Sequence, residues 1–513
     1  MTEPVSVTEV ERKLTVPEAF AIDDVLEALS TIGEITVERR RFLNAAYYDT
    51  DDFRLARSRV TLRRRTGGND SGWHLKLPPL DLLSDAREEQ VLPLSAGRPG
   101  RVPAPLAQAV VALTAGAPLL PLATQQTRRT PYVVHTSSGR PGVEIVDDRV
   151  SITEGAQAGM EYREIEVEVL GAAELLESVV AVLMDAGAAP SRSQSKGIKA
   201  LVGDAPLAPL IEIGSRPRPK QPASEAARHH VRTQVAAIVT QDQRLRRHLP
   251  DSVHQYRVAA RRLRSVLQAF GPLVDDTWAR ALRTELGWIA NVLSQSRDRE
   301  VLEARLIKAV RSLPPEIDGA AALMAIQKHL DAELAEANST IAAALASPRY
   351  AALMATLHAA ADAPPTTALA DGKSSKVLPP LADASWRKLA KQGRRLNNEL
   401  EGHDDHWHRT RITAKRARYT VEACVPVFGG PAKKFAKQLA QVTELLGEHQ
   451  DAAIAADLAL QLSSKTRGSR APFALGALYA QQRDLVAQTR REFIDIWPRV
   501  AHPGWRTWMS GPS

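Results

Sequence analysis

The stretch that decides the N-terminal fold is Glu9-Val10-Glu11-Arg12-Lys13-Leu14. In a β-strand, residues two apart share a face. Glu9, Glu11 and Lys13 therefore lie on one face of a strand, and the apolar Val10 and Leu14 lie on the other. A strand with one apolar face and one face that carries charges of both signs is the first clue to the fold.

The same spacing recurs further along the chain. It puts charged residues on a common face in four more segments, at Arg63 and Arg65, at Lys76, at Glu144 and Asp148, and at Glu164, Glu166 and Glu168. An open sheet would turn these faces to water, with ion pairs across the strands. A sheet closed into a barrel would enclose them as a channel. Such a channel suits a polyphosphate with a divalent metal, because Arg and Lys neutralise phosphate oxygens and carboxylates hold the ion.

The character of the chain changes near residue 205. Residues 5–202 combine short alternating segments with three helical stretches, at 17–31, 105–115 and 172–186, which predicts an α+β domain dominated by one antiparallel sheet. Residues 203–223 are rich in proline and read as a stiff linker. From 224 to 505 the pattern is helical and predicts an all-α bundle. A second break at 363–385 divides this region into repeats of about 224–362 and 385–505.

Two segments of the helical region match each other. His254-Gln-Tyr-Arg257-Val-Ala-Ala-Arg261-Arg262-Leu-Arg264 corresponds to His408-Arg-Thr-Arg411-Ile-Thr-Ala-Lys415-Arg416-Ala-Arg418. Downstream, Asp298 and Asp451 hold corresponding places. A shared offset over two separate features indicates an internal duplication, so we expect two equivalent helical hairpins around an approximate two-fold axis.

Each matched segment carries a basic stripe. At 100° per residue the histidine and the basic residues at the third, seventh and tenth positions after it fall on one helix face, opposite an apolar face. A single stripe of this kind is more often a solvated face or an ion-pair partner. Two duplicated stripes, each anchored by a histidine, favour an anion-binding surface instead.

Composition limits the partners. A net charge of +8 favours an anion such as nucleic acid, a membrane surface or a phosphate compound. Few aromatic residues interleave the basic stripes, which argues against single-stranded nucleic acid, and no groove-reading module is present. The single cysteine, Cys424, excludes an intramolecular disulfide. The polar, acidic first residues are unlike a signal peptide and the apolar stretches are too short to span a bilayer, which predicts a cytoplasmic protein.

The N-terminal motifs resemble a known family. Glu9-x-Glu11-x-Lys13 resembles the ExExK signature of CYTH, or triphosphate-tunnel, proteins. Further segments resemble that family's motifs in order: Tyr47-Tyr48-Asp49-Thr50, Leu62-Arg63-Arg64-Arg65, Trp73-His74-Leu75-Lys76, Arg87-Glu88-Glu89, Asp147-Asp148, Glu164-Ile165-Glu166 and Ser195-Lys196. The resemblance implies an eight-stranded antiparallel tunnel over residues 5–202 that acts on triphosphates with Mg²⁺ or Mn²⁺.

The same resemblance implies site residues. Catalysis would involve Glu9, Glu11 and Lys13, and substrate binding would involve Arg63, Arg65, Lys76, Arg129 and Lys196. The metal would be held by Glu9, Glu11, Asp148, Glu164 and Glu166. The chain departs from the family at Lys199, where many members have arginine. This change loses a bidentate grip and keeps open a tunnel that binds without turnover.

The helical motifs resemble the two halves of a CHAD domain, which implies a bundle that binds inorganic polyphosphate. The contacts that this implies are His254, Arg257, Arg261, Arg262, Arg264, His408, Arg411, Lys415, Arg416, Arg418, Lys433 and Lys437. Asp298 and Asp451 are expected to brace arginines.

The sequence thus predicts a polyphosphate-binding protein whose tunnel is a metal-dependent triphosphatase for inorganic triphosphate or a related linear phosphate, in the cytoplasm and with polyphosphate granules as one place of association. The first alternative is a non-catalytic polyphosphate-binding or targeting protein with a degenerate tunnel. The second is a nucleotide cyclase or nucleoside triphosphatase, which the absence of a Gly-rich phosphate loop disfavours.

Overall fold

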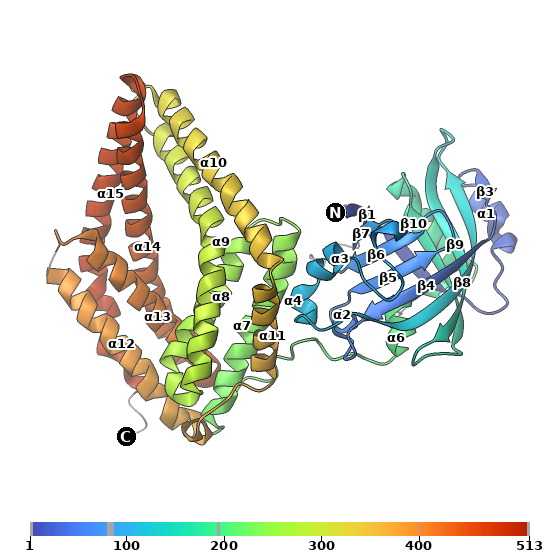
Figure 1. Ribbon diagram of the computed structural model, residues 1–513, viewed down its shortest axis with the longest axis horizontal. Helices are drawn as coiled ribbons and strands as arrows, with labels where there is room; N and C mark the ends of the chain where they lie inside the picture. The colour runs from blue at the N-terminus through green and yellow to red at the C-terminus, as the bar shows by residue number, and fades with distance from the viewer. Residues whose placement is uncertain (1–3, 80–86, 192–194, 399, 510–513) are drawn as a thin grey trace. The chain divides into compact units, whose positions relative to one another are not determined.

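The protein consists of two compact units. The computed structural model describes residues 4–79, 87–191, 195–398 and 400–509. Residues 1–210 form the first unit, built on a sheet, and residues 211–513 form the second, which is helical (Figure 1). Among the helices of the described residues, none combines the length and apolar character that a bilayer span requires.

The first unit contains one antiparallel sheet with eleven strands in the order β1-β7-β6-β5-β4-β8-β9-β10-β2-β11, with β3 paired to β8. The strands are β1 (Val5–Glu9), β2 (Glu11–Thr15), β3 (Ile35–Val37), β4 (Arg41–Asp49), β5 (Thr61–Thr66), β6 (Gly72–Leu77), β7 (Arg87–Leu92), β8 (Leu120–His135), β9 (Pro141–Glu154), β10 (Glu161–Val169) and β11 (Ala189–Pro190).

The N-terminal segment closes this sheet. Its first half, β1, pairs with β7, and its second half, β2, pairs with β10, so one short segment joins the two ends of the strand order. Counting β1 and β2 as one strand, and setting aside the short β3 and β11, leaves eight strands. The expected curled antiparallel tunnel is therefore confirmed, with two short additional strands.

Short helices pack against the sheet. They are α1 (Leu26–Ser30), α2 (Arg54–Arg57), α3 (Ala104–Ala109), α4 (Val111–Thr114), α5 (Leu176–Asp185) and α6 (Lys196–Val202). Outward apolar residues of β2, β9 and β10 pack with α1 and α5 in one core. A second core joins Tyr47 of β4 and Ile152 of β9 to Ile198 and Leu201 of α6.

The second unit is all-helical, as expected, and its helices follow a repeated order. They are α7 (Ala223–Arg246), α8 (Ser252–Ala269), α9 (Asp276–Arg311), α10 (Gly319–Leu345), α11 (Pro348–Asp362), α12 (Ser374–Asn398), α13 (Asp404–Phe428), α14 (Gly430–Lys465) and α15 (Arg470–Val500). The matched segments form α8 and α13, and each is followed by a 36-residue helix, α9 or α14. A long antiparallel partner comes next in both halves, α10 or α15 (Figure 1).

The break expected at 363–385 is shorter in the structure. Helix α12 begins at Ser374 and includes Pro379 and Pro380, which the sequence suggested as helix breakers. Each proline removes one backbone hydrogen bond, but Leu378, Pro379 and Ala382 are buried in the helical core and this packing keeps the segment helical. The backbone N–H of Ser375 also donates to the carbonyl of Pro219, which ties the start of α12 to the proline-rich segment.

Candidate functional site

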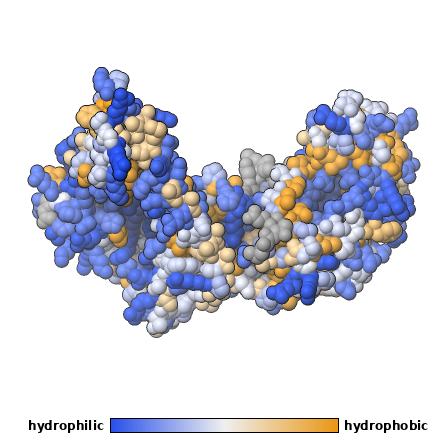
Figure 2. Space-filling model, turned by 45° about the horizontal axis from the view of Figure 1, so that its top comes forward, coloured by the Kyte–Doolittle hydropathy of each residue, from blue (hydrophilic) through white to orange (hydrophobic). Residues whose placement is uncertain are grey.

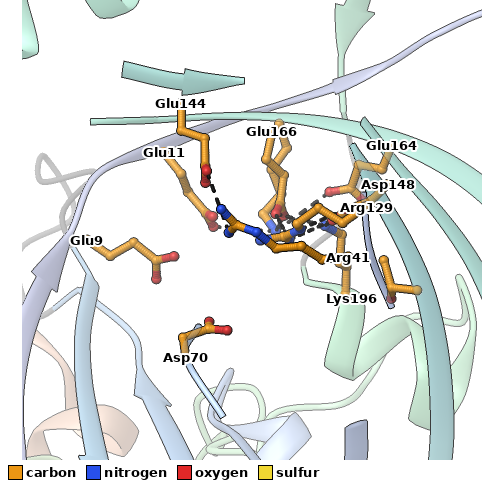
Figure 3. A network of polar contacts seen from close by, with 12 residues as sticks. Glu9, Glu11, Arg41, Asp70, Arg129, Glu144, Asp148, Glu164, Glu166 and Lys196 are labelled. Carbon is orange, nitrogen blue, oxygen red and sulfur yellow. Dashed lines mark hydrogen bonds and ion pairs between the residues drawn. The ribbon is translucent and has the colours of Figure 1, made fainter. Parts of the chain in front are cut away.

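The tunnel encloses a polar cavity of about 90 Å³. Most of the residues expected in the tunnel site line it, together with several that were not assigned a role. The lining residues are Glu9, Glu11, Lys13, Tyr47, Thr61, Arg63, Arg65, Asp70, Lys76, Arg87, Glu89, Arg129, Glu166, Glu168, Ser195, Lys196 and Gly197. Figure 3 shows Glu9, Glu11 and Asp70 pointing toward the same space.

The deep wall of the cavity is a network of buried ion pairs (Figure 3). Arg129 donates two hydrogen bonds to Asp148, at 2.8 and 2.7 Å, and its guanidinium lies 3.5 Å from Glu166. Lys196 pairs with Asp148 and, at 2.7 Å, with Glu166. Burial alone would raise the pKa of Glu166, but Lys13, Lys196 and Arg129 together hold it well below its usual value. The network therefore keeps its carboxylates ionised.

Lys13 stands between this network and the N-terminal carboxylates. Its ammonium contacts Glu166 directly and lies 3.4 Å from Glu11 and 3.6 Å from Glu164. Burial would lower the pKa of Lys13, yet these three carboxylates raise it well above its ordinary value. Lys13 is thus a fixed positive charge at the centre of the site.

The opposite wall, from β5 and β6, is rich in cations. Lys76 donates to Glu9 at 2.7 Å, and Arg63 lies 3.8 Å from Glu89. Burial, Arg63 and Arg129 lower the pKa of Arg65 to about 9, which reflects crowding of guanidinium groups. The Nε atoms of Arg63 and Arg65 are buried and find no hydrogen-bond partner among the described residues. These free donors suit an anion with several oxygens, such as a phosphate chain.

A set of carboxylates gathers on the N-terminal segment and β10. Glu11 is directly opposite Glu168 in the β2–β10 register. Burial and the nearby Glu9 raise the pKa of Glu168 to about 7, with Glu11 adding to the effect. A carboxylate beside two others is relieved by a bound cation.

The donor chemistry here fits a divalent metal. Mg²⁺ and Mn²⁺ prefer oxygen ligands, and Glu9, Glu11 and Glu168 supply only oxygens. Among the residues that the structure describes, no three acidic, histidine or cysteine side chains are spaced as a ready-made metal site. The reason is visible in the contacts: Lys76 holds Glu9, and Lys13 and Arg87 lie within 4.0 Å of Glu11.

Two expected metal ligands lie behind the cavity wall rather than in it. Asp148 is fully buried and engaged by Arg129 and Lys196. Glu164 is buried beside Lys13, and burial raises its pKa although Lys196 and Lys13 oppose this. Both positions favour bracing of the cations. Glu168 was visible in the Glu164–Glu168 alternation, but no role was assigned to it.

Helix α6 shapes the closed end of the cavity. A Cβ on Gly197 would lie 2.6 Å from the Tyr47 ring, so glycine is needed for this close approach. Lys199, where the family pattern has arginine, lies over the Tyr162 ring at 4.1 Å and does not line the cavity. The change at Lys199 therefore does not alter the residues that line the cavity.

In the helical unit the stripes of α8 and α13 come together at the junction of the repeats. Glu422 of α13 accepts from Arg418 of its own helix at 2.7 Å and lies 3.3 Å from Arg262 of α8. Asp298 accepts from Arg257 at 2.7 Å, and Asp451 lies 4.0 Å from Arg411. The expectation that these two aspartates brace arginines is confirmed. Nδ1 of His408 lies 2.7 Å from Gln450 Oε1, while His254 takes part in further contacts.

A second group of cations lies close to other cations, although Asp451 partly offsets their repulsion at Arg411 and Lys415. Burial, Arg261 and Arg411 lower the pKa of Lys415 to about 7. Burial and Arg283 lower the pKa of both Arg264 and Arg416. We name Arg261, Arg264, Arg283, Arg411, Lys415 and Arg416 the crowded cluster.

Two further residues that were expected to contact polyphosphate lie on α14. Lys433 and Lys437 are exposed on α14, and within the described residues no ion pair joins them to α8 or α13. The visible face of the helical unit is largely hydrophilic (Figure 2). The crowded cluster itself lies on α8, α9 and α13.

Comparison with known proteins agrees with both folds. A CYTH domain is matched over residues 8–188 and a CHAD domain over residues 229–460. The Mycobacterium tuberculosis protein MT2285 is 32% identical over 94% of each chain, and Rv2226 of another strain is 31% identical over the same shares. The chain belongs to the family of proteins in which a CYTH domain is followed by a CHAD domain.

Solved structures resemble parts of the chain. PptA from Streptomyces chartreusis is 26% identical, with a TM-score of 0.47, over 54% of this chain and 100% of its own. HpAC1 from Hippeastrum, for which a dominant triphosphatase activity is described, is 19% identical with a TM-score of 0.26, over 37% of this chain and 94% of its own.

Proposed function

We propose that the tunnel is a metal-dependent triphosphatase for inorganic triphosphate or a related linear phosphate, and that the helical unit binds inorganic polyphosphate. One observation carries the first part. The cavity combines buried guanidiniums that have unused donors, at Arg63 and Arg65, with a facing group of carboxylates at Glu9, Glu11 and Glu168.

In this proposal Arg63, Arg65, Lys76, Arg129 and Lys196 bind the phosphate oxygens. Glu9 and Glu11, with Glu168 beside them, hold Mg²⁺ or Mn²⁺, and Lys13 fixes their geometry from the centre of the site. The metal, when bound, neutralises phosphate charge and activates water. Asp148, Glu164 and Glu166 remain candidates for metal ligation, but their contacts favour the positioning of Lys13, Arg129 and Lys196.

The ion pairs of the tunnel support this division of roles. Lys76 and Glu9 neutralise each other. A bound phosphate can replace Glu9 as the negative partner of Lys76. A bound metal can replace Lys76 as the positive partner of Glu9. The exchange leaves no buried charge unpaired, which keeps its free-energy cost low.

The second candidate is a protein that binds phosphate chains without hydrolysis. The observation in its favour is that the described acidic side chains are not preset for a metal. A nucleotide cyclase or nucleoside triphosphatase is a third candidate, and consumption of ATP above that of triphosphate would support it. For location we propose the cytoplasm, with polyphosphate granules as a place of association through the helical unit.

The test is phosphate release by the full chain from inorganic triphosphate, long-chain polyphosphate, ATP and thiamine triphosphate, each with Mg²⁺, Mn²⁺ or EDTA. We expect metal-dependent release that is fastest with triphosphate. Glu9→Gln/Glu11→Gln should lower it by roughly 10²–10³-fold, because the carboxylates stabilise charge in the reaction.

The matched control is Glu27→Gln/Glu174→Gln, which changes two exposed carboxylates of the same unit. It should leave the rate unchanged. If none of the four substrates releases phosphate and the protein still binds polyphosphate, the second candidate replaces the proposal.

A further inference from the structure

The turn between β5 and β6 carries a carboxylate at the cavity. Gly67 and Gly68 of this turn have φ values of +83° and +75°, a left-handed backbone that favours glycine. A Cβ on Gly67 would lie 2.0 Å from the carbonyl oxygen of Phe42. The two glycines therefore fix the path of the turn, which brings Asp70 to the cavity wall (Figure 3).

Asp70 is held by its backbone more firmly than by its side chain. Its carbonyl oxygen lies 2.9 Å from Nε2 of His74, which is buried on β6. Its carboxylate pairs with the guanidinium of Arg65, but the Asp70 side chain is 51% exposed whereas that of Arg65 is 6% exposed. The carboxylate can thus return to water while the turn stays in place.

Arg65 is a buried cation that lies near other cations. Arg63 and Arg129 line the same cavity and disfavour the charge of Arg65, while Glu89 partly offsets them. Asp70 is the carboxylate with which the structure pairs it. A phosphate oxygen that reaches Arg65 takes the place that Asp70 occupies.

We propose that Asp70 is an internal anion that competes with substrate phosphate for Arg65 and so lowers the apparent affinity of every ligand that must displace it. The apparent affinity of a ligand equals its intrinsic affinity multiplied by the fraction of protein in which Asp70 leaves Arg65 free. A multiply charged phosphate chain also contacts Arg63, Arg129 and Lys196 and overcomes this cost. A single orthophosphate has fewer contacts and is kept out at ordinary concentrations. The identity of the ligand, though not the competition itself, rests on the proposed function.

The experiment measures equilibrium binding of inorganic triphosphate and of orthophosphate to the full chain in EDTA, by calorimetry. Asp70→Asn should tighten the binding of both ligands by roughly tenfold, because the competitor has lost its charge. Asp70→Glu should stay close to wild type. Asp52→Asn is the matched control, since it removes an aspartate that pairs with Arg54 outside the cavity, and it should change neither value.

Unchanged or weaker binding by Asp70→Asn would overturn the proposal. Asp70→Ser provides a second variant if the asparagine destabilises the turn, and it should tighten binding in the same way. A wild-type protein that releases no phosphate from triphosphate would contradict the proposed function alone, because tighter binding by Asp70→Asn would still establish the competition.

Discussion

In the tunnel, Arg129 and Lys196 lie against Asp148 and Glu166, whereas in the helical unit Arg264, Arg283 and Arg416 lie against one another. Both units hold half-buried cations, and both are proposed to bind phosphate. The tunnel balances its charges internally and can accept a ligand only by exchanging partners. The crowded cluster leaves its repulsion in place, so a polyanion relieves it. The balanced charges of the tunnel suit a site that selects among anions. The crowded cluster suits a site that binds many polyanions strongly.

The largest expected effect comes from breaking the balance in the tunnel. Asp148→Asn leaves Arg129 and Lys196 buried without one of the two carboxylates that they share. The free energy of unfolding of the first unit should fall by about 3–5 kcal/mol. Denaturant unfolding of the full chain, followed separately for the two units, measures this.

Asp298→Asn is the comparison for that measurement. Asp298 is exposed and pairs with Arg257. Its loss should cost less than about 1 kcal/mol, as for exposed ion pairs. An equal fall in the free energy of unfolding for Asp148→Asn and Asp298→Asn would show that the tunnel depends on its ion pairs no more than the helical unit does.

The structure explains which parts of the fold were predictable. Strand β2 and the helical stripes of α8 and α13 show their period because one face is apolar. Most of strand β8 shows no such period. Gln125, Thr127 and Arg129 of β8 point into the tunnel, while Gln126 and Arg128 point outward, so both faces are polar and no alternation appears.

The candidate site was predictable to a similar degree. Residues that carry a motif, such as Glu9 and Lys76, do line the cavity. Asp70 could not be found, because a turn with glycine and aspartate is typical of any exposed turn. The convergence of Arg261 with Lys415 depends on how α8 packs beside α13, which is a tertiary contact that helix periodicity alone does not contain.

The second-largest expected effect concerns the crowded cluster of the helical unit. Arg261→Ala/Arg411→Ala should weaken polyphosphate binding by roughly 100-fold, because two charge-assisted contacts are lost. It should change the stability of the second unit little, since the loss of repulsion among the cations offsets the loss of the pair between Arg411 and Asp451. Binding titrations and denaturant unfolding of the full chain test both parts.

Arg280→Ala/Arg387→Ala is the control for the arginine pair. Both arginines are exposed and pair with an aspartate one turn away on their own helix, Asp276 or Asp383. Binding should weaken by only a few fold, through general electrostatics. If the control weakens binding as much as Arg261→Ala/Arg411→Ala, then the crowded cluster is not the site.

The smallest expected effect concerns the proton of Lys415. Burial, Arg261 and Arg411 lower its pKa to about 7 in the folded protein, against an ordinary value of 10.5. Asp451 and Arg257 are the other charged groups that face it. Between about pH 7 and 10.5 the unfolded chain binds more protons at this residue, so this contribution to stability rises with pH. Polyphosphate favours the charged form, so binding takes up a proton and weakens by at most about tenfold per pH unit above pH 7.

Calorimetry at pH 8 in two buffers of different ionisation heat measures the proton uptake. The wild-type protein should take up close to one proton for each crowded cluster that binds polyphosphate. The Lys415→Met variant should take up much less. Lys433→Met, which changes an exposed lysine of α14, should behave as wild type. Equal uptake by Lys415→Met would assign the proton to another group.

The N-terminal segment that closes the sheet also sets the order in which the tunnel unit is completed during synthesis. Lys13 is made before the strands that follow it in the tunnel, yet its partner Glu166 lies 153 residues later in the chain. Contacts of such long sequence separation form late, after the intervening strands have paired. The first strand of the tunnel to be made is therefore the last to be locked in place. A chain interrupted before β10 holds Glu9, Glu11 and Lys13 without their partners on β10, so the proposed phosphate chemistry requires the complete tunnel.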